Sequence, residues 1–419
     1  MAEPVVVNLT FPLGTDNVSR ETALPDGAAR AIENLDVTRS GGLLCRKGER
    51  LVAAGSFHSL HTTPNFLLLV RNGVLSRMST TESITSIVTL TPDASVSYAE
   101  MNGDVFWTTP YQTGRVTAAG DSDYWGINVP PATVASAVSS GGLQAGRYLV
   151  TQTAVLPSGL ESGAPSPTAV DVVAGGGVQV TVPSGGTFAI YITPPNGAAE
   201  DLRLATIMES GSTAIIGTAP TGRLLESLWA IKPPPGQLIC VFKGRLWVAA
   251  NSVLWFTSER SPYWLFSAFG YFQFSGRITM LGAVEDGLFV GTNDGVWFLS
   301  GTNPTDMTMR QVSEVGAAKG TGPLDLPFNA FLSDGMPRTR PCVWMDMNGF
   351  LCVGLLSGNV IRPTDTRYSV GALSQFYTTF YRHEGIEQLF IVADADFNAS
   401  VNAVDLPVDI VRTHGASLG

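Results

Sequence analysis

The chain has 419 residues, enough for two or three domains that each bury a core of their own. Hydrophobic residues make up 44% and charged residues only 14%, against roughly 25% in an average soluble protein, so the chain is not disordered. The net charge is −10 and no run of Lys or Arg occurs, which excludes a surface that grips nucleic-acid phosphates. The scarcity of charge fits two interpretations equally: a surface largely covered by partners, or a β-rich fold with uncharged turns.

The N-terminus and the apolar runs bear on localisation. Met1-Ala2-Glu3-Pro4 lacks the basic stretch and apolar run of a signal peptide. The longest apolar runs, such as residues 66–70, fall far short of the roughly 20 residues that a membrane span needs. We therefore expect synthesis in the cytoplasm and no stable membrane insertion.

The cysteines do not form a metal-binding pattern. The four residues, Cys45, Cys240, Cys342 and Cys352, include no CxxC spacing. Cys240 and Cys352 lie within apolar runs, which predicts buried free thiols. A Cys342–Cys352 bridge across a hairpin is the alternative.

The first predicted element is a short helix. Residues 28–35 follow Pro25-Asp26-Gly27, and Asp26 is a candidate N-cap for about two helical turns. Elsewhere the 45 Gly and 26 Pro are spread so densely that they exclude long helices.

Strand signals recur in one form: an apolar run, a tight turn built on Gly, and a second apolar run. Four of the five turns are Asn-Gly or Asp-Gly, which tolerate the positive φ that a type I′ hairpin demands at both central positions. The turns are Asn72-Gly73, Asn102-Gly103, Lys243-Gly244, Asp286-Gly287 and Asn348-Gly349. Three of the hairpins continue into a further strand, so each unit is a meander of three or four strands.

Repeated small meanders predict a β-propeller or a stacked array of sheets, because one meander cannot bury both of its faces. The spacing from Gly244 to Gly287 is near the usual blade period of roughly 40–50 residues. The other spacings are irregular, so the number of blades stays open.

A stretch of different character lies between the two groups of meanders. Pro130-Pro131 opens it and Pro233-Pro234-Pro235 closes it. Short alternating strands within it, such as residues 146–156 and 178–182, predict a fibronectin-III-like β-sandwich without a Cys pair. The rigid proline segments fit an inserted domain held at a fixed angle.

The predicted fold class is therefore all-β: a β-propeller-like array of antiparallel meanders with an inserted fibronectin-III-like β-sandwich. The predicted domains are residues 1–130 as the N-terminal part of the propeller, 131–235 as the sandwich, and 236–419 as the C-terminal part of the propeller.

The search for chemistry assigns no catalytic, cofactor-binding or metal-binding residue, and we expect no cofactor and no enzyme. His58 and His61 point to opposite faces of a strand, where they cannot share a metal. Asp121-Ser-Asp123, Asn293-Asp294 and Asp394-Ala-Asp396 do not complete a calcium loop and are interpreted as turn carboxylates.

A glycosidase would need paired carboxylates, for which Glu259, Glu285 and Asp286 are the candidates. Glu285 and Asp286 belong to a hairpin turn, which favours a solvated role for both. The aromatic run in residues 262–274 is interpreted as propeller core, with an exposed contact surface as the alternative.

Several stretches resemble tail hub or nozzle proteins of short-tailed bacteriophages. Residues 16–27, 33–37 and 41–46 resemble the opening of these proteins, and residues 244–259, 272–279 and 287–301 resemble their middle. The resemblance covers the propeller parts at both ends, about half of the chain, and is weaker in the sandwich.

The resemblance implies a ring, usually of six copies, beneath the portal and its adaptor in the virion. The ring would enclose the DNA exit channel, dock tail fibres or spikes, and pass double-stranded DNA without sequence-specific binding. The family contributes no catalytic residue. A net acidic channel would keep DNA from adhering during ejection.

Two other functions remain open on the sequence. One is a glycan-binding or glycan-cleaving β-propeller used in host attachment, which predicts an aromatic-lined pocket with two facing carboxylates. The other is a cellular propeller scaffold that binds peptides, which predicts a monomer.

Overall fold

The structure is a computed structural model that describes residues 10–11, 13–32, 35–37, 42–45, 50–257, 266–320, 340–363, 365, 369, 375–383, 386–394 and 413–414. Within these residues the chain forms no α-helix; its helical turns are the short 3₁₀ segments η1 (Glu21–Ala23), η2 (Ala199–Asp201), η3 (Pro304–Asp306) and η4 (Leu356–Gly358). The rest of the regular structure is strand, and nearly all of the pairing is antiparallel. The predicted all-β class is confirmed.

The first two large sheets are four-stranded meanders in chain order. One consists of β5 (Phe57–Thr62), β6 (Leu67–Arg71), β7 (Val74–Met78) and β8 (Ile84–Thr89). The next consists of β9 (Ser97–Met101), β10 (Asp104–Thr108), β11 (Thr113–Val116) and β12 (Ser122–Asp123).

Further meanders follow after the sandwich. The third sheet holds β20 (Ala230–Ile231), β21 (Leu238–Phe242), β22 (Arg245–Ala250), β23 (Val253–Thr257) and β24 (Phe266–Gln273). The fourth holds β25 (Ile278–Val284), β26 (Gly287–Thr292), β27 (Gly295–Ser300) and β28 (Thr308–Ser313), and the fifth holds β30 (Cys342–Met345), β31 (Leu351–Gly354) and β32 (Val360–Ile361). A last sheet joins β29 (Lys319–Gly320) to β33 (Gln375–His383), β34 (Ile386–Asp394) and β35 (Thr413–His414).

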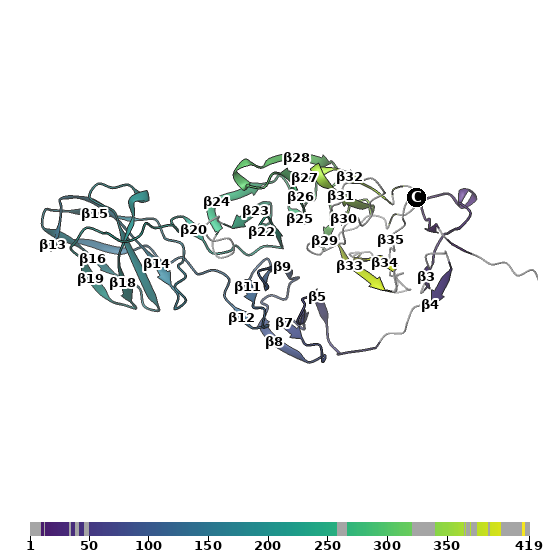
Figure 1. Cartoon of the computed structure of the whole chain (residues 1–419), viewed down its shortest axis with the longest axis horizontal. Coiled ribbons are helices and arrows are strands. Elements are labelled where there is room, and N and C mark those ends of the chain that lie inside the picture. The colour runs from purple at the N-terminus through teal and green to yellow at the C-terminus, as the bar shows by residue number, and fades with distance from the viewer. Residues whose placement is uncertain are drawn as a thin grey trace, which may run out of the picture.

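These sheets follow one another around a common centre, on one side of the molecule in Figure 1. Edge strands of successive sheets, β9, β21 and β25, lie next to one another, and β25 also lies beside β30. This arrangement is the predicted propeller-like array of meanders.

The sandwich projects from the array between β12 and β20 (Figure 1). Its three-stranded sheet has the order β13-β16-β19 and its four-stranded sheet the order β15-β14-β17-β18. The strands are β13 (Val134–Leu143), β14 (Gly146–Val155), β15 (Thr168–Val172), β16 (Gly176–Thr181), β17 (Thr187–Ile192), β18 (Arg203–Glu209) and β19 (Thr213–Ile216). Apolar side chains of both sheets, among them Tyr148, Val178 and Ile190, form the core between them.

Two facts bear on the predicted domain ranges. The strand β20 lies inside the range 131–235, yet it pairs with β24 of the third sheet. Among the described residues before β5, the chain forms the small pairs β1 (Gly14–Thr15) with β2 (Ala28–Ala29) and β3 (Leu35–Val37) with β4 (Leu43–Cys45). The three ranges stay predictions.

The helix predicted for residues 28–35 is wrong. Gly27 has a φ of +85°, and Ala28 and Ala29 then pair in parallel with Gly14 and Thr15. Asp26 does not cap a helix. A segment this short gains too little from helical hydrogen bonds to repay nucleation, so the tertiary pairing prevails.

The cores of the array lie between its sheets. One cluster joins the first and second sheets through residues such as Val70 and Trp107, and the next joins the second and third through Phe106 and Ile239. Two more clusters continue this sequence to the fifth sheet. Every sheet in this run is therefore stabilised by its neighbours rather than by itself.

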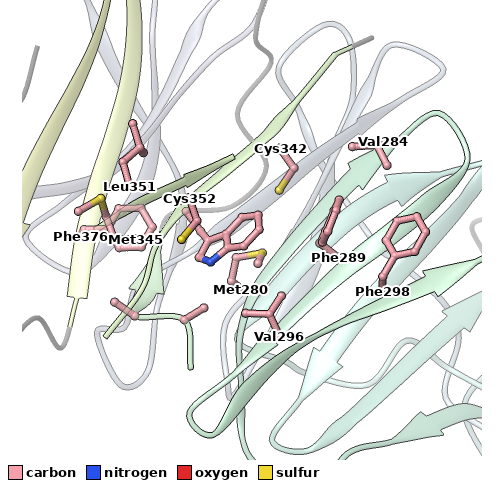
Figure 2. Packing of buried hydrophobic residues seen from close by; sticks show 13 residues of the cluster. Met280, Val284, Phe289, Val296, Phe298, Cys342, Met345, Leu351, Cys352 and Phe376 are labelled. Atoms are coloured by element: carbon pink, nitrogen blue, oxygen red, sulfur yellow. The ribbon is translucent and has the colours of Figure 1, made fainter. Parts of the chain in front are cut away.

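The cluster between the fourth and fifth sheets shows this packing in detail (Figure 2). Phe289 of β26 and Phe298 of β27 lie with their ring centroids 4.8 Å apart, and Trp344 of β30 approaches Phe289 to 5.5 Å. Cys342, Cys352 and Phe376 complete the same cluster from the following strands. Phe289 is fully buried and bridges the two sheets.

The predicted turns are partly confirmed. Both central residues have positive φ at Asn72-Gly73, Asn102-Gly103 and Lys243-Gly244, as a type I′ turn requires. At Asp286-Gly287 the turn falls one residue earlier, because Gly287 is the first residue of β26 and pairs with Val284. A Cβ at Gly287 would lie 2.2 Å from the Phe298 ring, so this glycine permits packing rather than a turn.

The inter-sheet core leads to a stability prediction. Replacing Phe289 by Ala should lower the free energy of unfolding by about 3–5 kcal/mol, because the ring is fully buried between two sheets. Replacing Phe269, which is 73% exposed, should change it by less than about 0.5 kcal/mol. Urea unfolding of both variants measures the difference, and equal effects would contradict a core between the sheets.

Candidate functional site

An exposed feature of the described residues is a group of aromatic side chains on β24 of the third sheet and on the segments beside it. Phe269 is 73% exposed, Tyr271 45% and Trp229 41%. Trp229 meets Phe269 edge-on at 6.3 Å, and Tyr271 lies 5.0 Å from the partly buried Trp255. We call these four residues the aromatic surface.

The strand β24 explains why some of its aromatic residues are buried and others exposed. Phe266, at its start, is fully buried and packs edge-on against Trp125. The pairing of β23 with β24 then shifts between Trp255 and Thr257, and Gly270 faces the Phe256 ring. Side chains alternate along a strand, so Phe269 and Tyr271 on either side of Gly270 face outward.

The prediction for the aromatic run in residues 262–274 is therefore half right. Phe266 and Phe274 belong to the core, and Phe272 packs against Trp247 at 6.1 Å. Phe269 and Tyr271 are exposed, as the alternative expects. Tyr263 and Trp264 lie outside the described residues.

Trp229 was missed by the sequence analysis. It stands far from the aromatic run in the sequence and joins the surface because β20 pairs with β24. Its φ is +63°, which is uncommon for a bulky residue, and its carbonyl accepts a hydrogen bond from the Ala268 amide at 2.9 Å. In the sequence, the nearest signal was Pro233-Pro234-Pro235, which predicts the end of the sandwich but gives no indication that Trp229 is exposed.

The aromatic surface offers ring faces to a ligand. Large aromatic side chains bury much area at little entropic cost, so they are enriched where proteins meet partners. The same faces can stack on the apolar face of a sugar ring.

The two histidines of β5 contact separate carboxylates, one in the segment between β8 and β9 and the other on β9. His58 Nε2 lies 2.9 Å from Asp93, and His61 Nε2 lies 3.0 Å from Glu100. His61 also stacks on Tyr98 at 5.0 Å. Among the residues that the structure describes, no three His, Cys, Asp or Glu side chains gather closely enough to hold a metal ion.

The aspartates considered for a calcium loop have other partners. Asp121 forms an ion pair with Arg77 at 3.7 Å, and Asp123 pairs with Arg115. Asp294 accepts hydrogen bonds from Thr292 and Ser275, and that from Thr292 chiefly lowers its pKa. The side chains of Asp394 and Asp396 lie outside the described part of the chain.

The glycosidase carboxylates are bound to the neighbouring sheet. Glu285 accepts a hydrogen bond from the Arg340 amide at 3.0 Å, and Asp286 accepts one from the Ser357 amide at 2.8 Å. Both residues form the predicted hairpin turn, and Glu285 is exposed as expected, whereas Asp286 is partly buried. Their hydrogen bonds nevertheless connect the fourth sheet to segments of the fifth. Glu259 lies outside the described residues.

Three cysteines are buried free thiols, as predicted, and Cys342 and Cys352 do not form a bridge. Burial raises the pKa of the Cys342 thiol to about 12 and, together with Asp346, that of Cys352 to about 11. Neither thiol is a nucleophile at neutral pH. The Cys45 side chain lies outside the described residues.

Comparison with known proteins finds only loosely similar solved structures. No known protein family matches the chain, and no curated protein matches its sequence. The Pan2 WD40 domain of Neurospora crassa is 9% identical, with 81% of this chain and 86% of that chain covered and a TM-score of 0.33. AztD from Citrobacter koseri is 11% identical, with 80% and 82% covered and a TM-score of 0.32.

A third similar structure is BBS1N, solved in complex with ARL6DN. It is 13% identical, with 81% of this chain and 90% of that chain covered and a TM-score of 0.32. Likeness this loose carries no argument, so the β-propeller assignment rests on the sheets themselves. No helix in the described ranges is long and apolar enough to cross a membrane.

The His61–Glu100 pair predicts a pH dependence of stability. Burial lowers the pKa of His61, and Glu100 opposes this shift only in part. As the pH falls below about 6.5, the unfolded chain takes up the proton first, so the folded state loses stability. Replacing His61 by Gln removes this titration and keeps a hydrogen-bonding side chain beside Glu100.

The free energy of unfolding of His61→Gln should therefore fall less between pH 7 and pH 5 than that of the wild type. Urea unfolding at each pH measures both slopes. A variant with the same or a steeper slope would contradict a lowered pKa at this position.

Proposed function

We propose that this protein is a structural, non-enzymatic subunit of a short-tailed bacteriophage tail, a nozzle or hub protein that forms a ring below the portal and adaptor. The observation that carries the proposal is the architecture: propeller-like sheets from both parts of the chain, with a sandwich projecting between them (Figure 1). The resemblance of residues 16–27 and 244–259 to tail hub proteins supports the same function.

The array suits a wall that must bear load. Each sheet is held by ladder hydrogen bonds, and successive sheets share buried cores, so a force on one sheet is passed to its neighbours. An interior packed in this way transmits strain rather than absorbing it. We propose that about six copies close into a ring, as the resemblance implies.

The charge of the chain suits the passage of DNA. A net charge of −10 gives the ring an acidic average surface, which repels phosphates during genome ejection. The protein would contact double-stranded DNA in passing, without sequence-specific binding. No cofactor and no stable membrane insertion is needed for this role.

The partners are then copies of the chain, the tail adaptor, and fibres or spikes. Uncharged, aromatic contact areas such as Phe269 and Tyr271 are typical of protein interfaces. The protein would reside in the virion after synthesis in the host cytoplasm.

Immunolabelling of virions tests the proposed location. An antibody raised against the purified chain should decorate the distal end of the tail of intact particles in negative-stain images. Light scattering of the chain released from tails should give a multiple of its 44.3 kDa mass. Labelling of the capsid, or particles without the chain, would refute the proposal.

Glycan binding during host attachment is the second candidate function. The observation that favours it is the aromatic surface, because exposed rings stack on sugars and Phe269 is 73% exposed. Glycan cleavage has less support, since Glu285 and Asp286 are bound to the neighbouring sheet.

Glycan-array binding separates the two functions. If the chain binds host surface glycans, Phe269→Ala and Tyr271→Ala should each weaken retention about tenfold, as loss of one stacked ring does. Tyr111→Ala is the matched control, because Tyr111 is 59% exposed in the turn between β10 and β11 of the second sheet. Equal loss in all three variants, or no retention by the wild type, would exclude glycan binding by this surface.

A further inference from the structure

Residues 223–231, which we call the return segment, lead from the sandwich back to the propeller array. Their first half pairs with the sandwich. The Leu204 amide donates to the Arg223 carbonyl at 2.9 Å, and the Leu225 amide donates to the Leu202 carbonyl at 2.9 Å. The side chains of Leu225 and Leu228 pack against Tyr191 and its neighbours on the outer face of the sandwich.

The second half of the return segment pairs with the third sheet of the array. Ala230 and Ile231 lie opposite Ser267 and Phe266 of β24. Trp229 is the point of transition: its φ of +63° turns the chain, and its ring contacts Phe269. The return segment is therefore hydrogen-bonded to the sandwich at one end and to the array at the other.

A loop of the sandwich, residues 156–165, packs onto the middle of the return segment. The Ala164 amide donates to the Ser227 carbonyl at 3.2 Å, and Ala164 forms a parallel bridge with Leu228. A Cβ at Gly163 would lie 1.8 Å from the Ala230 carbonyl oxygen, so any other residue would separate the loop from the segment.

Glu161 holds this loop from within. Its side chain is 12% exposed and accepts hydrogen bonds from the Tyr191 hydroxyl at 2.9 and 3.1 Å and from Thr153 at 3.3 Å. The same carboxylate forms an ion pair with Arg223 at the start of the return segment. A mostly buried charge that is shared in this way by three segments is costly to displace, because each partner would lose its acceptor.

The segment that leads from β12 to the sandwich packs against the end of the return segment. A Cβ at Gly126 would lie 2.3 Å from Pro233, and Ile127 and Leu156 pack against Ala230. The two segments that connect the array to the sandwich, around Gly126 and around Ala230, are therefore packed against each other. The adjoining prolines alone would stiffen each segment without fixing its angle.

We propose that the loop 156–165 and the return segment form a clamp that fixes the sandwich as a rigid arm on the propeller array, with Glu161 as its positioning residue. Domains joined by ordinary linkers move relative to one another by default. Here a displacement of the sandwich passes through the return segment directly to β24 and the aromatic surface. This inference does not depend on the proposed tail function.

Distance measurements between spin labels test the clamp in the full chain. Spin labels at Asp171→Cys on β15 and Met309→Cys on β28 report the position of the sandwich relative to the array, and both sites are exposed. Cys45 is replaced by Ser in this chain. The other three cysteines are buried and should not react with the label. The otherwise unchanged chain should give a single narrow distance maximum in electron–electron double resonance.

Gly163→Val should shift and broaden the maximum, and Glu161→Gln should broaden it while thermal unfolding stays cooperative. Glu200→Gln is the matched control, because Glu200 is an exposed carboxylate of the sandwich outside the clamp, and it should leave the distribution unchanged. If Gly163→Val does not fold, Glu161→Gln alone decides. A broad distribution in the unchanged chain, or a Glu161→Gln distribution that matches that of Glu200→Gln, would overturn the proposal.

Discussion

The whole array depends on one constraint: a small antiparallel sheet has two faces and cannot shield both by itself. Four of the apolar clusters lie between successive sheets rather than within one, so each sheet provides half of the core of its neighbour. This sharing explains why the edge strands β9, β21 and β25 lie next to one another. It also explains why a domain can be inserted between β12 and β20 only if the second and third sheets still meet, which Phe106, Trp125 and Phe266 accomplish.

The sequence predicts the parts of this fold that depend on local backbone chemistry. Asn72-Gly73 and Asn102-Gly103 form the expected tight turns, because positive φ at both positions is a property of the dipeptide. Prediction fails where the local structure depends on a residue that is distant in the sequence. Gly287 is placed by the Phe298 ring, and Ala28 by its pairing with Gly14, neither of which is visible in a local window.

The same division applies to the candidate site. Phe269 and Tyr271 are recognisable as an aromatic run, but alternation alone does not tell which faces are covered by the second sheet. Trp229 enters the surface only through the pairing of β20 with β24. The turn position of Glu285 and Asp286 was predictable, but their hydrogen bonds to Arg340 and Ser357 were not, since those residues are distant in the sequence.

Trp229 connects the two features that matter most for function. It belongs to the return segment that fixes the sandwich, and its ring is part of the aromatic surface. Its left-handed backbone would be costly for a bulky residue on its own, and it persists because the Ala268 amide and the pairing of Ala230 hold both sides of it. A partner that covers Phe269 would therefore also lie beside the residue at which the return segment passes from the sandwich to the array. With the proposed clamp in place, a contact at this surface would bear on the orientation of the sandwich.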